Sequence, residues 1–146
     1  MTGQESRRIV VGVDGSSASV RALAWAVREG RLSGGVVDVI CAWQYPVSYG
    51  WAMADADPEI RKLSMETLEK AIAEAGAAAE EKVRIRLHVI EQEPAQALIE
   101  AAKGADLLVV GSRGHGGLTS MRLGSVSQRC VHHAPCPVVV VHSHEG

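Results

Sequence analysis

Five short apolar runs, each separated from the next by one segment with helical spacing, constrain the fold of this chain most strongly. The first and fourth of these runs are continuous and apolar, which is typical of strands buried within a sheet. Strands joined through single helices imply right-handed crossovers, and therefore a parallel sheet with helices on both faces. We place the five strands at Ile9–Val13, about Val36–Trp43, Val83–Val89, Leu107–Val110 and Val138–Val141.

Capping residues, prolines and glycines mark the ends of the predicted helices. A serine side chain can cap the first amides of a helix, proline fits its first turn, and glycine ends it. These signals are Ser16-Ser17 and Gly34-Gly35 for the first helix, Asp57-Pro58 for the second, and Pro94 and Gly104 for the third; the fourth helix covers about Val126–His133.

The second helix and the third strand are predicted from contrasting periods. In the strand, Arg84, Arg86 and His88 alternate with apolar residues, which indicates one face open to water and a place near the sheet edge. In the helix, we expect one apolar stripe to face the core, formed by Ile60, Leu63, Leu68, Ala71, Ile72 and Ala75.

Composition limits the class of protein and its partners. The chain has 146 residues, which suits one domain spanning 1–146, with residues 1–6 as a disordered tail. The net charge of −2, without a basic block, argues against nucleic acid and anionic membranes as partners. No apolar run reaches the ~20 residues of a membrane helix, and the polar start lacks the apolar core of a signal peptide. Three cysteines leave one unpaired in any disulfide scheme, so we expect a cytoplasmic protein with reduced thiols.

A glycine-rich stretch from Gly111 to Ser127 follows the fourth strand and precedes the last helix. Glycines allow a ligand to approach the backbone closely, and unpaired amides at a helix start favour phosphate. Arg113 and Arg122 add positive charge nearby. A flexible surface loop is the alternative interpretation, but four glycines within seven residues, between strand and helix signals, favour a phosphate-binding loop.

Asp14 follows the first strand as Gly111 follows the fourth. Open parallel sheets bind ligands at the carboxyl ends of strands, where the strand order reverses. If the two strands are neighbours, Asp14 can accept hydrogen bonds from ribose hydroxyls or an adenine amine while the loop binds phosphates. The alternative role of Asp14, as a turn residue before the first helix, does not exclude ligand contact.

The segment 44–57 holds most of the aromatic residues of the chain, namely Tyr45, Tyr49 and Trp51, and it directly follows Trp43. It could cover a ligand or form a subunit contact. We favour a simpler role, in which it covers the end of the sheet.

Three stretches resemble the nucleotide-binding universal stress proteins. Gly111-x-x-Gly114, nine residues and then Gly124-Ser125 matches their G-2x-G-9x-G-(S/T) signature. The first strand with Asp14-Gly15-Ser16, the fourth strand with Gly111-Ser112, and the last strand, Cys136 to Val141, agree in register. The resemblance covers about Arg8 to His142.

The resemblance implies a doubly wound, Rossmann-like (HUP-type) α/β fold with strand order 3-2-1-4-5, which places strands one and four side by side. It implies ATP as the ligand, with Mg²⁺ or Mn²⁺ on the phosphates, and a homodimer through the last strand, Val138, Val139, Val140 and Val141. An exposed valine edge would also invite aggregation unless it were paired. The residues expected to bind the nucleotide are Gly12, Val13, Asp14, Ala42, Gly111, Ser112, Arg113, Gly114, His115, Gly116, Gly117, Gly124, Ser125, Val126 and Ser127.

Several catalytic signatures do not fit. No Gly-Lys-Ser/Thr follows the glycines, as a P-loop requires, and neither the dinucleotide fingerprint nor a G-x-S-x-G elbow is present. For His115 we favour a minor ligand contact over a role in phosphoryl transfer. A zinc site is disfavoured by the spacing of Cys130, His132, His133 and Cys136.

The sequence therefore predicts an ATP-binding stress protein with at most slow hydrolysis, because Asp14 is the only acidic group placed at the site and no general base is evident. Two alternatives remain. One is an enzyme of the same superfold, since such sheets host many chemistries. The other is a module that binds AMP or cyclic AMP, or no nucleotide.

Overall fold

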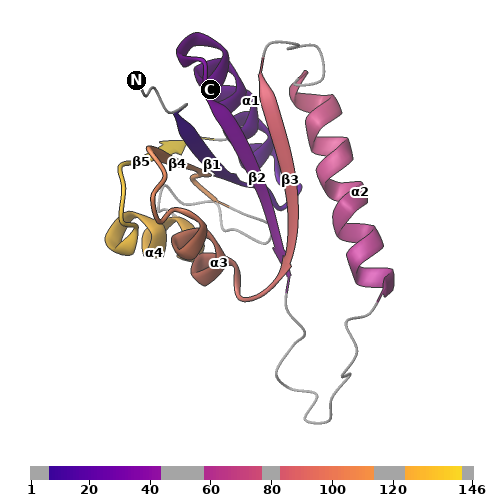
Figure 1. Cartoon of the computed structure of the whole chain (residues 1–146). Helices are drawn as coiled ribbons and strands as arrows, with labels where there is room; N and C mark the ends of the chain where they lie inside the picture. The colour runs from indigo at the N-terminus through magenta and orange to yellow at the C-terminus, as the bar shows by residue number, and fades with distance from the viewer. Residues whose placement is uncertain (1–6, 44–57, 77–82, 114–123, 143–146) are drawn as a thin grey trace.

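The computed structural model describes residues 7–43, 58–76, 83–113 and 124–142. Strands and helices alternate along the chain, as the apolar runs predict (Figure 1). The strands are β1 Arg8–Gly12, β2 Val36–Trp43, β3 Arg84–Glu91, β4 Leu107–Gly111 and β5 Val138–Val141. The helices are α1 Ser17–Ser33, α2 Pro58–Ala75, α3 Pro94–Ala101 and α4 Ser125–His133.

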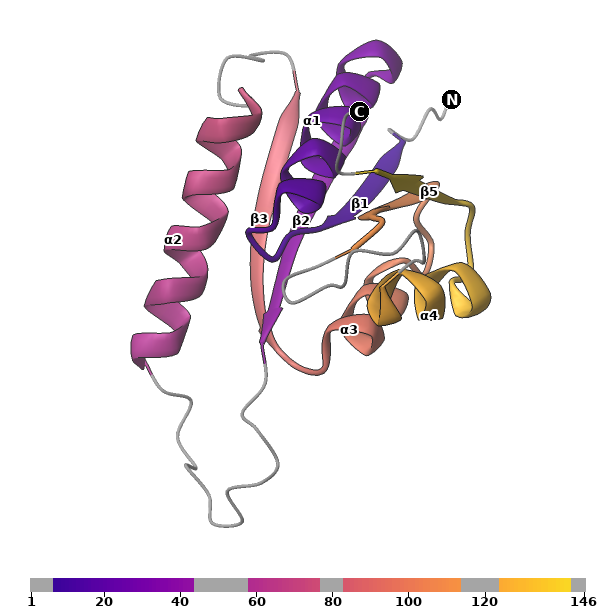
Figure 2. The same cartoon turned by 180° about the vertical axis from the view of Figure 1, so that it is seen from behind.

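All strand pairs are parallel, and the sheet has the order β3-β2-β1-β4-β5. The predicted order is thus confirmed, as are the edge position of β3 and the adjacency of β1 and β4. Helices α1 and α2 cover one face of the sheet, while α3 and α4 lie against the other (Figures 1 and 2). Alternate residues of β1, β4 and β5 therefore enter two separate cores.

The larger core lies between the sheet and α1 with α2. Ile9 and Val11 of β1 meet Leu23 of α1 and Leu68 of α2 there, all fully buried. On the other face, Val10, Leu108 and Leu98 pack with Cys130 of α4. Burial of such side chains contributes roughly 1.5–3 kcal/mol each, which makes these two layers the main source of stability.

The α2 stripe is predicted with one error. Leu68 and Ala71 are buried, and Ile72 and Ala75 pack on the core, but Leu63 is 57% exposed. Ser64 is buried in its place, because the helix is rotated so that this small polar residue faces β2 and reaches Cys41. None of the described helices has the length and apolar character needed to cross a membrane.

Candidate nucleotide-binding edge

The carboxyl ends of β1 and β4 lie side by side. Ile9 pairs with Leu107, and Val11 with Val109, so Gly12 and Gly111 leave the sheet at the same edge. From this point α1 runs along one face of the sheet and α4 lies on the other (Figures 1 and 2). We call this place, formed by residues 12–14, 111–113 and 124–127, the β1–β4 edge. It is the reversal point at which open parallel sheets bind ligands.

The segment after β1 is held by its own side chains. Ser16 N donates to Asp14 Oδ1 at 2.9 Å, and Ser19 N donates to Ser16 Oγ at 3.2 Å. Asp14 N donates to Ser19 Oγ at 3.2 Å, while Gly15 takes a φ of 87° that favours glycine. Asp14 is exposed at the end of this turn. Asp14 therefore does serve as a turn residue before α1, and the turn fixes its carboxylate at the β1–β4 edge.

The segment after β4 is tied to the start of α4. Ser112 N donates to Val141 O at 2.8 Å, and Gly124 N donates to Ser112 O at 2.7 Å. In addition, Ser127 Oγ donates to Gly111 O at 2.5 Å. The first turn of α4 is therefore anchored on the last residues of β4, with the ends of the glycine-rich stretch hydrogen bonded together.

The N-terminus of α4 is capped differently from those of α1 and α3. Ser16 caps α1, and Glu93 caps α3 by accepting from Gln96 N at 2.9 Å. At α4 the N-cap is Gly124, which makes no side-chain hydrogen bond. The amides of the first turn, residues 125–127, are thus not capped by the N-cap side chain, and the positive end of the helix dipole adds to their attraction for an anion.

Two glycines at this edge lie very close to neighbouring helices. A Cβ on Gly111 would lie 2.7 Å from Ala18 Cβ and 2.8 Å from the Ala18 carbonyl carbon. A Cβ on Gly12 would lie 2.7 Å from Leu98 Cδ1. Both distances are shorter than real Cβ contacts. At Gly111 the obstacle includes the Ala18 backbone, so this glycine is needed for the close approach of α1, whereas at Gly12 it is the end of the flexible Leu98 side chain, which could move aside. The sequence interpretation included neither contact.

The other predicted residues are distributed as follows. Val13 is 4% exposed, and its amide donates to Ile40 O at 2.9 Å, so its side chain belongs to the core. Ala42 is half-buried near the end of β2, Arg113 is half-buried after β4, and the Ser127 side chain is buried. The predicted Gly114, His115, Gly116 and Gly117 lie outside the described residues, as does the aromatic segment 44–57.

Sequence reasoning missed Ser19 and Ala18. Ser19 is 5% exposed and links Asp14 to the first turn of α1, while Ala18 supports Gly111. Ser16 and Ser19 occupy the N-cap and the third helical position, and this spacing could have indicated that Ser19 contacts the turn after β1. No local signal marks the contact between Ala18 and Gly111, because these two residues are far apart in the sequence.

The thiols near this part of the molecule are protonated at neutral pH. Burial raises the pKa of Cys41, and the nearby Asp14 carboxylate adds to this, while a hydrogen bond with Ser64 opposes it. Burial raises the pKa of Cys130 to about 11. All three cysteines, Cys136 included, are free thiols, and the described residues contain no group of three His, Cys, Asp or Glu that could hold a metal ion.

The model of the universal stress protein family matches residues 5–142. The chain belongs to this family. The resemblance inferred from the glycine-rich stretch and the first, fourth and last strands is thereby confirmed.

The relatives of this universal stress protein differ in length. One from Thermus aquaticus is 37% identical over 138 residues, which cover 92% of this chain and 98% of the relative. One from Mycolicibacterium smegmatis is 32% identical over 142 residues, which cover 92% of this chain and 47% of the relative. The chain thus spans about half the length of the mycobacterial relatives that it matches. A solved universal stress protein in complex with cAMP is 26% identical, with a TM-score of 0.68 over 97% of this chain and 100% of that one.

Proposed function

We propose that this universal stress protein binds an adenine nucleotide, with ATP as the expected ligand, at the β1–β4 edge. The observation that carries the proposal is the N-terminus of α4, where Gly124 supplies no capping side chain and hydrogen bonds hold the first turn against β4. Because the N-cap position carries no side chain to occupy them, amides fixed in this way can receive phosphate oxygens directly.

In this proposal Asp14 accepts hydrogen bonds from the ribose hydroxyls or the adenine amine. The turn at Gly15 and Ser16 holds its carboxylate at the edge, so little ordering is needed on binding. Gly111, Gly114, Gly124 and Ser125 accommodate the ribose and phosphates, with the amides of residues 125–127, and Ala42 lies beside the base. A Mg²⁺ or Mn²⁺ ion on the phosphates would neutralise charge on the ligand.

We further propose that the nucleotide regulates assembly or interactions in the stress response, with at most slow hydrolysis, in a cytoplasmic homodimer. The dimer would form through β5, which is the last strand of the sheet and carries the half-buried Val138–Val141. Sedimentation velocity measures this directly, and a monomer at micromolar concentration would contradict the dimer without affecting the nucleotide site.

Gly124→Asp tests the nucleotide site. Gly124 has φ −70° and ψ 166°, which any residue can adopt, and aspartate is a good N-cap, so we expect unchanged or slightly higher stability. The new carboxylate would occupy the amides and repel phosphate, so we expect roughly a hundredfold loss of ATP affinity in calorimetry. Gly124→Ser would cap the helix without adding a charge, so it should lose less ATP affinity than Gly124→Asp. Equal affinity of wild type and Gly124→Asp would contradict the site.

The second candidate ligand is cyclic AMP or AMP, which the relative solved with cAMP favours. Mass spectrometry of the nucleotide that co-purifies, followed by competition calorimetry with ATP, AMP and cyclic AMP, ranks the ligands. A turnover assay with radiolabelled ATP tests the weak-hydrolase alternative: rapid phosphate release would favour an enzyme over a binding protein.

A further inference from the structure

The sheet face toward the viewer in Figure 1 is covered unequally. Helix α3 packs on β1 and the lower part of β2, and α4 packs on β5, while the ribbon of β3 and the upper part of β2 run uncovered in front. Parallel sheets normally bury both faces under helices. Here β3 instead directs Arg84, Arg86 and His88 to the open face, in the alternation noted in the sequence.

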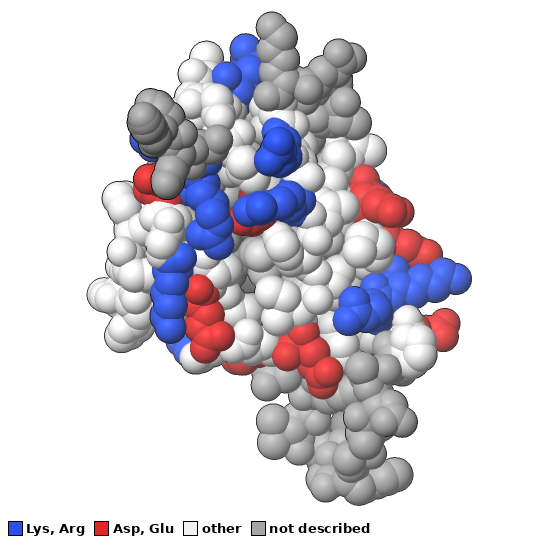
Figure 3. All heavy atoms as spheres, viewed as in Figure 1, with Lys and Arg blue, Asp and Glu red and all other residues white. Residues whose placement is uncertain are grey.

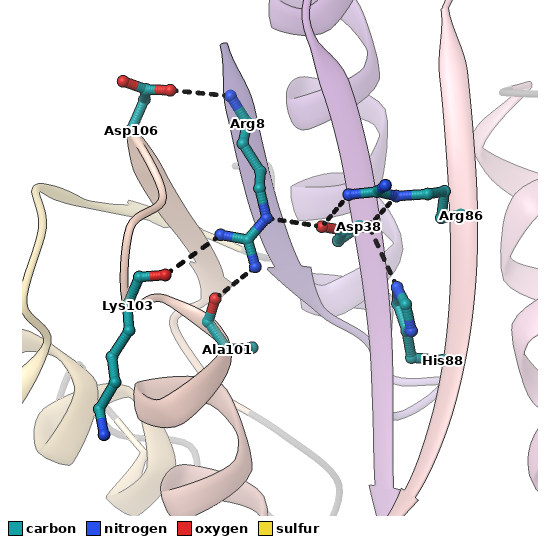
Figure 4. Close-up of polar contacts among 7 residues, drawn as sticks. All are labelled: Arg8, Asp38, Arg86, His88, Ala101, Lys103 and Asp106. Atoms are coloured by element: carbon teal, nitrogen blue, oxygen red, sulfur yellow. Dashed lines mark hydrogen bonds and ion pairs between the residues drawn. The ribbon is translucent and has the colours of Figure 1, made fainter. Parts of the chain in front are cut away.

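A buried carboxylate organises the charges on this face. Asp38 of β2 has a side chain only 4% exposed. Its Oδ1 accepts from Arg86 Nε at 2.7 Å and lies 3.1 Å from His88 Nε2, and its Oδ2 accepts from Arg86 Nη2 and Arg8 Nε at 3.0 Å each (Figure 4). Arg8 also reaches Ala101 O at 2.7 Å. The guanidinium groups of Arg8 from β1 and Arg86 from β3 are therefore fixed over β2.

What reaches solvent here is positive. The side chains of Arg8, Arg86 and His88 are 32%, 50% and 42% exposed, whereas the carboxylate lies beneath them. Arg8 and Arg86 share the charge of Asp38, and the exposed Arg84 adds a further positive charge, while the exposed Asp106 lies at one end, where it accepts from the Arg8 amide (Figure 4). Figure 3 shows Lys and Arg side chains gathered over the upper parts of β1 to β3, with acidic side chains mainly toward the lower rim and the right. The face is thus opposite in sign to the whole chain, whose net charge is −2.

We propose that this basic face, formed by Arg8, Arg84, Arg86 and His88 around Asp38, docks an acidic segment of a partner protein. Asp38 holds Arg86 through Nε and Nη2, and neither Arg84 nor Nη1 of Arg86 has a hydrogen-bond partner among the residues that the structure describes. A guanidinium edge matches a carboxylate in shape and charge. Because Asp38 already fixes Arg86, its ordering costs little on binding, unlike that of a solvated arginine.

A protein segment fits this face better than nucleic acid or a membrane. Few cations are gathered here, while the whole chain is acidic and repels a polyanion at longer range. Among the five residues that form this face, His88 alone carries a ring, so successive bases would find no series of rings on which to stack. A short run of Asp and Glu residues needs only local complementarity, which Arg84 and Arg86 provide.

The test uses the full-length protein and a fluorescein-labelled peptide in which glutamate alternates with serine. Fluorescence anisotropy measures binding at low salt, and a lysine–serine peptide is the control ligand. The variant is Arg84→Glu, because Arg84 lies outside the Asp38 contacts and its reversal should not disturb the fold. The matched control is Arg28→Glu, which makes the same charge change at an exposed site on α1, across the sheet.

We expect the acidic peptide to bind and the lysine peptide not to bind. Arg84→Glu should weaken binding roughly tenfold, while Arg28→Glu should change it little. Amide exchange of β2 and β3 should slow in the complex. The proposal is overturned by absent binding, by equal effects of the two variants, or by tighter, Arg84-dependent binding of poly-uridine RNA or phosphatidylserine vesicles. None of these results depends on nucleotide binding at the β1–β4 edge.

Discussion

Asp38→Asn is the substitution whose effect follows most directly from the described contacts. Burial alone would raise the pKa of Asp38, but hydrogen bonds and charges from Arg86 and His88 outweigh it and lower the pKa from 3.8 to about 2. The ionised carboxylate is therefore favoured in the folded protein. Asparagine has nearly the same shape but cannot carry the charge, so it resembles the permanently protonated state.

The magnitude follows from the shift. Nearly two pKa units, at about 1.4 kcal/mol each, give an upper limit of about 2.5 kcal/mol. Since the side chains of Arg86 and His88 are about half exposed, water screens their charges. We therefore expect Asp38→Asn to lower the free energy of unfolding by about 1.5 kcal/mol at pH 7.

The sign of the pH dependence is fixed by the lowered pKa. The contribution of Asp38 is fully present above its unfolded pKa, near 4, and is lost as the pH falls through the folded value near 2. The difference between wild type and Asp38→Asn should shrink to about half at pH 3. Below pH 2 the two proteins should be nearly equal in stability.

Urea denaturation of both proteins at pH 7, 4 and 3, followed by circular dichroism, measures this difference. Arg86→Gln in each background completes a double-mutant cycle, in which loss of Arg86 should matter much less once Asp38 is gone. A stability difference that stays the same from pH 7 to pH 3, or additive effects in the cycle, would refute the assignment of stability to the ionised carboxylate.

Two further substitutions test packing. Gly111→Ala should destabilise the protein by about 1–3 kcal/mol, because the new Cβ would overlap Ala18. The control is Gly34→Ala, whose Cβ meets nothing within 4 Å but whose φ of 75° is strained for alanine. Comparing the urea midpoints of the two variants separates the cost of the overlap from the cost of backbone strain. Leu68→Ala should lower the free energy of unfolding by about 2–5 kcal/mol, whereas the exposed Leu63 on the same helix should lose less than about 0.5 kcal/mol on substitution by alanine. Similar losses in the two variants would contradict the orientation of α2.

The strands were predictable because their apolar runs are continuous and the breaks between them contain strong local signals. The helix ends at Ser16 and Gly34 were predictable for the same reason, since a cap and a left-handed glycine act within a few residues. Leu63 was misplaced because both Leu63 and Ser64 fit a helical stripe loosely, and only contact with β2 decides which faces inward. Local pattern thus determined the elements, and packing determined their rotation.

The adjacency of β1 and β4, on which the candidate site depends, was predictable, but the contacts that support this edge were not. Asp14 and Gly111 could be assigned to one edge once β1 and β4 were expected to be neighbours. The sequence did not show that Gly111 packs against the Ala18 backbone or that Gly12 lies against Leu98, because these contacts join distant parts of the chain. For Asp38, the pattern marked a strand position but not the arginines from two neighbouring strands that stabilise its charge.

The hydrogen bond from Gly124 N to Ser112 O has a consequence for how this protein can diverge. This bond joins the end of β4 to the start of α4, so the positions of these two elements do not depend on how many residues lie between Ser112 and Gly124. Closure entropy grows only slowly with length, and doubling such a connection costs roughly 0.6 kcal/mol. The fold alone would therefore tolerate insertions between these two residues at small thermodynamic cost, so the fixed nine-residue spacing from Gly114 to Gly124 is accounted for by the proposed nucleotide site and not by the supporting architecture.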